Sequence, residues 1–233
     1  MTPRLRALLI PGLMTLVMLA TLLGLGTWQV NRMLWKRDIL AAIALAERAP
    51  PVPLGTTPPR FARVRAEGVF HPTTALYGAE VRTIGAEPTG GARLLAVLRR
   101  DGTAPVLVDR GWVPVPHPAA PPAPMPAEPA AVEGYVRPPD AAGPFAATDD
   151  LANRRFFTLN PATIGPALGV PDLAPFILVA LAPPGSPSPG SPDPARTLPR
   201  PANNHLSYAI TWYGLAAGLL VIFALYARKV LRP

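Results

Sequence analysis

The apolar residues of this chain form two long uncharged runs, one near each end, with only short runs between them. The first run, residues 7–30, contains no charged side chain. The second extends from about Ser207 to Tyr226 and is followed by Arg228 and Lys229. Since ~20 apolar residues in a helix cross the bilayer core, both runs predict membrane-spanning helices. Two spans place the two ends of the chain on the same side of the membrane.

The first run predicts an uncleaved anchor and not a signal peptide. Arg4 and Arg6 precede it, as in a signal peptide, but its apolar stretch is too long and no cleavage site of the A-x-A type follows. Apolar residues continue at helical spacing through residues 31–48. We therefore expect the membrane helix to extend beyond the bilayer surface.

The short runs between the two spans are typical of β-strands. They contain β-branched and aromatic residues and are bounded by Gly, Pro and Asp; they cover residues 61–70, 92–100, 104–115, 130–138, 154–159 and 175–181. Asn160 as the cap, Pro161 at the first position and Gly169 as the stop predict one short helix. Short strands at regular spacing favour a small barrel or sandwich.

The expected fold class is therefore membrane α+β, with N- and C-terminal transmembrane helices that flank a β-rich, barrel- or sandwich-like soluble domain. The expected boundaries are 1–48 for the first helix with its extension, 49–203 for the soluble domain and 204–233 for the second helix and its tail. Two proline-rich segments, 114–130 and 183–201, interrupt the soluble domain. Their composition predicts extended, mobile loops outside the core, the second of them a tether before the final helix.

The basic charge of the chain belongs to the membrane segments. The formal net charge is +8, yet residues 51–200 carry 13 Arg against 12 Asp and Glu. Positive residues beside apolar spans are a membrane-anchoring pattern, whereas a nucleic-acid-binding protein carries its basic patch on the folded domain. Nucleic acid is therefore not an expected partner. The absence of cysteine excludes disulfides, thiolate metal sites and a cysteine nucleophile.

No pattern typical of an enzyme is found in the sequence. The glycine-containing segment 85–91 is not followed by the Lys and Ser/Thr of a phosphate-binding loop. His71 precedes a proline and His117 lies within a proline-rich segment, so both are expected to be solvated. The neighbouring Asp149 and Asp150 are expected to serve a loop or a cap. We therefore do not expect an enzyme.

Chemistry-bearing residues gather where the two spans meet the membrane surface. Two sets recur at helical spacing: Trp28, Arg32 and Trp35, and His205, Tyr208 and Trp212. An aromatic belt explains the tryptophans and the tyrosine. It explains His205 less well, and it explains Asn203 and Asn204 hardly at all.

A haem site is the functional alternative to an aromatic belt. Imidazole ligates iron, aromatic rings pack on the macrocycle, and basic side chains pair with propionates. His205, Trp212 and Tyr208 share one helical face, and Arg32, with Lys36, lies at the same membrane level on the first helix. The residues alone leave both alternatives open.

Small residues in the two spans predict how the helices pair. Gly214 and Gly218 are four residues apart in the second span, as are Ala20 and Gly24 in the first. Such pairs let helix backbones approach closely in lipid. We expect them at the contact between the spans.

Three segments in order along the chain resemble one known family. Residues 25–40 (LGTWQVNRMLWKRDIL), 106–115 (VLVDRGWVPV) and 203–216 (NNHLSYAITWYGLA) are similar to the surfeit locus protein 1 family. Residues 132–138 and 154–170 also resemble the family pattern, with lower specificity. The resemblance covers the whole chain, and the long proline-rich insertions are its main departure.

The resemblance implies a role in assembling cytochrome c oxidase, a haem-copper oxidase. Family members supply or stabilise haem a for its catalytic subunit, and haem a synthase is a further candidate partner beside membrane lipid. His205 matches the histidine proposed to contact haem a, and Trp212 matches the tryptophan near it. The implied location is a bacterial inner membrane, with both termini cytoplasmic and the central domain periplasmic. A scaffold that binds an oxidase subunit without haem remains the alternative.

Overall fold

The computed structural model describes residues 3–115, 121–183, 185–186 and 191–232. It consists of two compact units, one formed by Met1–Ala42 with Arg200–Pro233 and the other by Ile43–Pro199. We call them the helix unit and the sheet unit. Each is described by itself.

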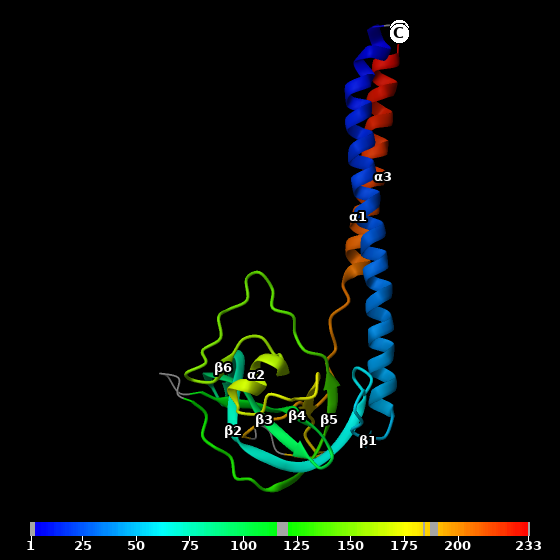
Figure 1. Cartoon of the computed structure of the whole chain (residues 1–233). Coiled ribbons are helices and arrows are strands. Elements are labelled where there is room, and N and C mark those ends of the chain that lie inside the picture. The colour runs from blue at the N-terminus through cyan, green and yellow to red at the C-terminus, as the bar shows by residue number, and fades with distance from the viewer. Residues whose placement is uncertain (1–2, 116–120, 184, 187–190, 233) are drawn as a thin grey trace. The chain divides into compact units, whose positions relative to one another are not determined.

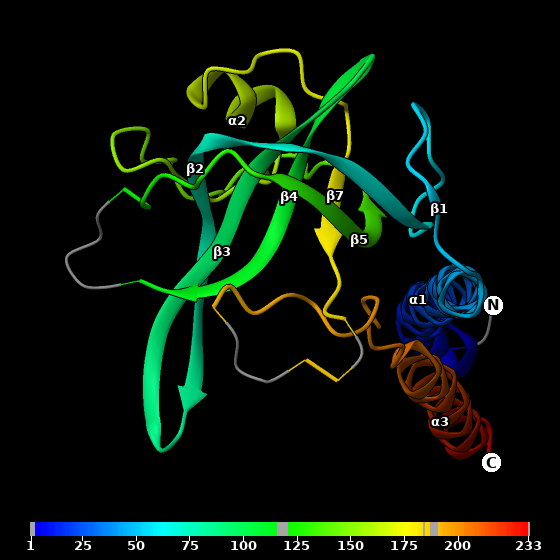
Figure 2. The ribbon, with the colours of Figure 1, turned by 90° about the horizontal axis from the view of Figure 1, so that it is seen from below.

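The helix unit is an antiparallel pair of long helices. Helix α1 covers Pro3–Arg48, of which the last six residues belong to the sheet unit, and α3 covers His205–Leu231. The two helices lie side by side (Figures 1 and 2). Both are long and apolar enough to cross a membrane, with mean hydropathy of 2.3 and 1.9 in their most apolar windows. Only 6% and 11% of these windows is buried, so they are not core helices of a soluble fold.

The contact between the helices follows one stripe on each. On α1 this stripe includes Leu22, Gly26 and Gln29, and on α3 it includes Ala209 and Ala216, all buried. Their spacings of three, four and seven residues keep them on one helical face.

Gly26 is the small residue that allows close approach. A Cβ atom at Gly26 would lie 2.7 Å from the ring of Tyr213, whose side chain therefore occupies the space above the glycine. The Tyr213 hydroxyl then reaches Thr27 Oγ1, 3.2 Å away. The ring of Tyr213 on α3 thus packs directly on Gly26 of α1.

The expected contact through Gly214 and Gly218 is wrong. A Cβ atom at either position, or at Gly24, would meet no atom within 4 Å, and both α3 glycines are exposed. They lie outside the helical phase of Ala209 and Ala216, so the motif is present in the sequence but on a face that does not pack against α1. The helices pair through Gly26 instead.

The sheet unit contains seven strands and one short helix. The strands are β1 (Val52–Pro53), β2 (Arg63–Ile84), β3 (Glu87–Arg100), β4 (Thr103–Pro114), β5 (Pro129–Arg137), β6 (Arg155–Phe156) and β7 (Ile177–Ala180), and the helix is α2 (Pro161–Ala167). All six sequence-predicted strands and the helix are present. Asn160 caps α2 as expected, because its side chain accepts a hydrogen bond from the Ala162 amide at 3.0 Å.

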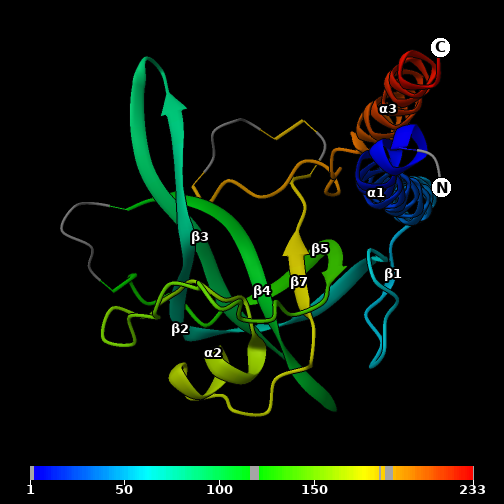
Figure 3. The same cartoon turned by 90° about the horizontal axis from the view of Figure 1, so that it is seen from above.

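Six of the strands follow one another in a strongly bent sheet in the order β1-β2-β3-β4-β7-β5, and β6 pairs parallel to β2 beside this path. Strand β2 pairs with β3 along most of its length and also with β5 through residues 63–69. The last strand of the order, β5, therefore also lies beside β2. Strand β7 pairs parallel to β4 and antiparallel to β5. The domain is therefore neither a two-sheet sandwich nor a regular up-and-down barrel. Figure 3 shows the β2–β3 hairpin extending beyond the rest of the sheet.

The concave side of the sheet holds the apolar core. Alternation along β4 turns Val106 and Val108 to this side, where both are fully buried. They pack with Phe70, Leu98 and Leu178 from three other strands. Leu107 and Asp109 on the same strand are buried as well, so both faces of the sheet are covered at β4 and burial there does not alternate.

The expectation that both proline-rich segments are mobile loops is wrong for their described parts. In the first, the amide of Met125 donates to Pro72 O at 2.9 Å, and its side chain packs against the core. In the second, Asp193 and Leu198 are buried, and Asp193 exchanges two backbone hydrogen bonds with Trp112. Proline removes donors but not acceptors or apolar surface, so such segments can still pack.

The central sequence motif, residues 109–112, has a structural role. The buried Asp109 carboxylate forms an ion pair with Arg93 and accepts a hydrogen bond from the Gly111 amide at 3.0 Å. Gly111 has φ +120°, and a Cβ atom there would lie 2.2 Å from the carbonyl oxygen of Asp193. Only glycine allows this approach. Trp112 then fills the core with 1% of its surface exposed.

Candidate functional site

His205, the first residue of α3, meets α1 through one short hydrogen bond. Its Nδ1 lies 2.6 Å from Oε1 of Gln29. Since the amide oxygen can only accept, Nδ1 is the donor of this bond, and in the neutral imidazole Nε2 then carries the lone pair. An imidazole oriented through its Nδ1–H is the usual arrangement of a metal-binding histidine. His205 thus has its second nitrogen in the form that binds a metal.

Gln29 is a site residue that sequence reasoning missed. It lies on the contact stripe of α1, and only 9% of its surface is exposed. A buried amide in an apolar helix pair requires a hydrogen-bonding partner, and His205 provides it. The signal was available: within residues 7–30, Gln29 is the one side-chain amide, and it recurs seven residues after the buried Leu22.

Two further hydrogen bonds join the same ends of the helices. Asn203 Nδ2 donates to the Met33 carbonyl at 3.2 Å. Lys36 Nζ donates to the Ala202 carbonyl at 2.6 Å. We call these two bonds, together with the bond between Gln29 and His205, the polar clasp. The clasp gives Asn203 a structural role that an aromatic belt does not explain.

The structure separates the two basic residues predicted for propionates. Lys36 is half-buried and its ammonium group is bound to a backbone carbonyl in the clasp. Arg32 is exposed, outside the clasp, and its guanidinium lies 4.7 Å from the ring centre of Trp35. Of the two, Arg32 presents the more accessible cation.

The three sequence-predicted residues of α3 differ in position. His205 and Trp212 lie on the contact stripe and are half-buried, whereas Tyr208 is 56% exposed on its flank. The Trp212 Nε1 is buried without a described partner, as is Oδ1 of Asn203. The site therefore contains a donor and an acceptor whose hydrogen-bonding capacity is unused among the described residues.

Among the residues that the structure describes, the other histidine and the paired aspartates form no second metal-binding cluster. His71 Nδ1 accepts a hydrogen bond from the Thr73 amide at 3.3 Å, and His117 lies outside the described residues. Asp149 accepts from the Phe157 amide at 2.7 Å. Asp150 accepts from the side chain of Asn153 at 2.7 Å. Both aspartates thus serve the loop as expected, and no cluster of three metal-binding side chains occurs among the described residues.

Comparisons with known proteins find the same family over most of the chain. The model of the SURF1 family matches residues 16–217. Surfeit locus protein 1 of Takifugu rubripes is 26% identical, over 91% of this chain and 95% of its own length. The SURF1-like protein of Rickettsia bellii is 28% identical, over 94% and 91% of the two chains. That of Monosiga brevicollis is 29% identical, over 88% and 83%.

Proposed function

The chain belongs to the SURF1 family, and we propose that it is a membrane-bound assembly factor for a haem-copper oxidase, cytochrome c oxidase. In this proposal it binds haem a through His205 and aids its delivery to, or retention in, the catalytic subunit. The observation that supports the haem role is the hydrogen bond between Gln29 and His205. It leaves Nε2 as the ligating atom.

The donor set fits a haem. Neutral imidazole is the commonest protein ligand of haem iron, and the amide of Gln29 restrains both its tautomer and its ring orientation. Trp212, seven residues further along α3, offers an indole ring on the same stripe. When bound, haem a supplies the redox-active iron of the finished oxidase; the chain supplies a ligand, its orientation and an apolar surround.

The propionates require cations near the membrane surface. Arg32 is our candidate, because its guanidinium is exposed beside Trp35 and can form paired hydrogen bonds with a carboxylate. Lys36 is a weaker candidate since it would first release the Ala202 carbonyl. Tyr208, exposed on the flank of α3, would contact the edge of the macrocycle.

We further propose that the protein resides in a bacterial inner membrane, with both termini cytoplasmic and the sheet unit periplasmic. Two apolar helices support the placement of both termini on one side, and a long intervening domain can translocate largely regardless of its charge. The partners would be the catalytic subunit, haem a synthase and lipid. Reporter fusions at Pro121 should report the periplasm, and fusions after Arg232 the cytoplasm. A cytoplasmic signal at Pro121 would reverse the orientation.

The decisive experiment is a visible absorption spectrum of the full-length protein purified from cells that make haem a. His205→Ala should lose or strongly shift the Soret band. Trp212→Phe should have a smaller effect because an aromatic surface remains. His71→Ala, a histidine of the sheet unit, should leave the spectrum unchanged. An unaltered spectrum and haem content in His205→Ala would reject the ligand assignment.

A scaffold without haem is the second candidate, and the polar clasp favours it. In the clasp, Asn203, Lys36 and His205 act as ordinary links between helices. His205→Asn separates the two functions, because an asparagine Nδ2 can still donate to Gln29 but offers no nitrogen lone pair to iron. The scaffold predicts normal oxidase assembly in His205→Asn cells. The haem role predicts loss of assembled haem a despite an intact clasp.

A further inference from the structure

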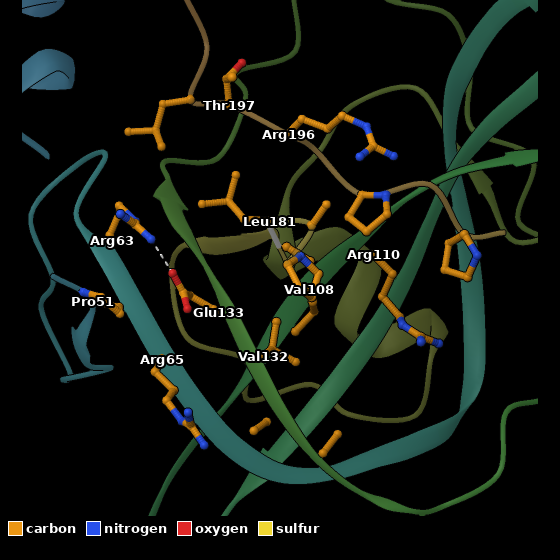
Figure 4. Close-up of a pocket in the computed structure, with 18 of the residues that line it drawn as sticks. Pro51, Arg63, Arg65, Val108, Arg110, Val132, Glu133, Leu181, Arg196 and Thr197 are labelled. Carbon is orange, nitrogen blue, oxygen red and sulfur yellow. Dashed lines mark hydrogen bonds and ion pairs between the residues drawn. The ribbon is translucent and has the colours of Figure 1, made fainter. Parts of the chain in front are cut away.

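The sheet unit contains a cavity that the haem role does not use. Its volume is about 1020 Å³, which exceeds the space that a single inorganic anion needs and lies at the upper end for organic ligands. Phe70, Val108 and Val132, which belong to or pack against the core, form its apolar floor. Pro192 and Pro194 of the second proline-rich segment line it as well. Figure 4 labels Val108 and Val132 among the residues that line the cavity.

Arg110 brings a cation onto the apolar side of the sheet. Asp109 and Gly111 pair with the consecutive residues Leu95 and Leu94, so Arg110 is the extra residue of a β-bulge and strand alternation does not place it. Its side chain lines the cavity together with Phe70 and Val108. Its guanidinium lies 4.9 Å from the ring centre of Phe70. Its Nη1 lies 2.7 Å from Sδ of Met125. Burial lowers the pKa of Arg110 below its ordinary value, although a guanidinium remains charged.

The partners of Arg110 differ from those of the comparable arginines. The other half-buried arginines in the described part of the sheet unit each donate to at least one oxygen: Arg63, Arg82, Arg93, Arg100, Arg137, Arg154 and Arg155. Arg110 has a sulfur atom and an aromatic ring but no oxygen acceptor among the described residues. A partly buried cation without an anion carries a desolvation cost that an anionic ligand would offset.

The other charged residues of the cavity wall are already engaged. Arg63 forms an ion pair with Glu133, and Figure 4 shows this pair apart from Arg110. Arg196 donates to Asp193 Oδ1 at 3.1 Å. Arg65, which also lines the cavity, pairs with Glu67 at 3.1 Å. Arg110 is therefore the arginine of this wall that has no oxygen partner among the described residues.

We propose that this cavity binds a peptide segment of a partner protein in which a carboxylate side chain is flanked by apolar residues. The carboxylate pairs with Arg110, whose planar guanidinium matches carboxylate geometry. The apolar neighbours cover Phe70, Val108 and Val132. A lone anion would leave this floor exposed, and a purely apolar peptide would leave Arg110 without an acceptor. The site is independent of haem binding by His205.

The test uses the full-length protein in detergent and a labelled peptide, acetyl-Leu-Phe-Asp-Phe-Leu-amide, with its Asn-containing twin as the neutral probe. Fluorescence anisotropy should show at least tenfold weaker binding of the neutral twin. Arg110→Met, which keeps an apolar stem over Phe70, should weaken the acidic peptide at least tenfold. The Arg110→Met protein should therefore bind the acidic peptide and its neutral twin with similar affinity.

Arg99→Gln is the matched control, because Arg99 is an exposed arginine that does not line the cavity. It should bind the acidic peptide as the unchanged protein does, and circular dichroism should show that both variants are folded. Equal binding of the two peptides to the unchanged protein would overturn the proposal, as would full affinity in Arg110→Met. Two results would show that a peptide is not the occupant of this cavity. The acidic peptide would fail to bind at millimolar concentration, or equimolar inorganic phosphate would displace it.

Discussion

The helix unit and the sheet unit arrange their side chains in opposite ways. In the helix unit the outer surface is apolar, with Ile10 72% and Ile222 68% exposed, while the amide of Gln29 is buried at the contact. In the sheet unit Leu95 and Val106 are fully buried. Two helices that can cross a membrane predict this difference: lipid is as apolar as leucine, so packing and hydrogen bonds would hold the helices together there, whereas water drives apolar side chains inward.

The two units also differ in the kind of polar interaction that they contain. The sheet unit has charged pairs, such as Arg93 with the buried Asp109 and Arg82 with Asp193 at 2.8 Å. Burial tends to lower the pKa of Arg93, but the charge and hydrogen bond of Asp109, with the nearby Tyr135 and Glu80, together outweigh this effect and the pKa is raised. The helix unit joins its helices through side-chain amides, an imidazole, hydroxyls and backbone carbonyls, and its one charged group in these bonds, Lys36, donates to a carbonyl and not to an acid. Four variants test whether each unit depends on its own kind of interaction.

The largest effect is expected in the core of the sheet unit. Trp112→Ala should lower the free energy of unfolding by about 3–5 kcal/mol, because it leaves a large cavity in a packed interior. It also removes the bond from the indole Nε1 to the Glu80 carbonyl, 3.2 Å in length. Urea unfolding followed by circular dichroism measures the loss. Trp28→Ala, at a tryptophan 52% exposed in the helix unit, is the control and should leave this transition unchanged; equal losses would contradict the contrast.

An intermediate effect is expected at the helix contact. Gly26→Leu should weaken the pairing of α1 and α3 by about 1–3 kcal/mol, because the new side chain collides with the ring of Tyr213. Gly218→Leu should have no effect, since that position is open. Cysteines in place of Met33 and Asn203 allow the pairing to be measured by bismaleimide cross-linking. If Gly218→Leu reduced the yield as much as Gly26→Leu, the assigned contact stripe would be wrong.

A smaller effect is expected in the polar clasp. Gln29→Leu removes the partner of His205 and should weaken the helix pair by about 1 kcal/mol, the typical value of a hydrogen bond between membrane helices. Gln29→Glu keeps an acceptor for Nδ1–H and should restore the pairing. Unfolding in a graded mixture of mild detergent and dodecyl sulfate measures both variants. A Gln29→Leu protein as resistant as the unchanged chain would show that the bond contributes nothing.

The smallest effect concerns titration in the sheet unit. Hydrogen bonds from the Asn153 side chain and amide hold the pKa of Asp150 below its usual range. The carboxylate therefore contributes stability above the unfolded value of ~3.9 and loses it as the pH falls through the folded pKa. Asp150→Asn should remove this part of the decline in urea midpoint between about pH 6 and about pH 3. Asp101→Asn, at an exposed aspartate, should retain it; an identical decline in all three proteins would refute the assignment.

The sequence alone was sufficient for features that depend on neighbouring residues. The length of two uncharged runs determined both long helices, and Asn160 determined the start of α2. Residue type and turn residues located six strands but missed β1 and residues 71–84 of β2. These signals are local, since apolar periodicity, caps and turns act within a few residues. His205 could also be singled out, because a histidine at the mouth of a lipid-exposed helix requires an explanation.

Only the tertiary structure decided which faces meet. The rotation of α3 against α1 puts Gly26 at the contact and leaves Gly218 outside it, although both occur in helices of similar composition. It also pairs Gln29 with His205 and engages Lys36, while leaving Arg32 exposed. In the sheet unit, the path of the chain brings Asp193 to Trp112 and Arg110 over Phe70. Such contacts join residues far apart in sequence, so they depend on the packing of the whole fold and leave no periodic signal in the chain.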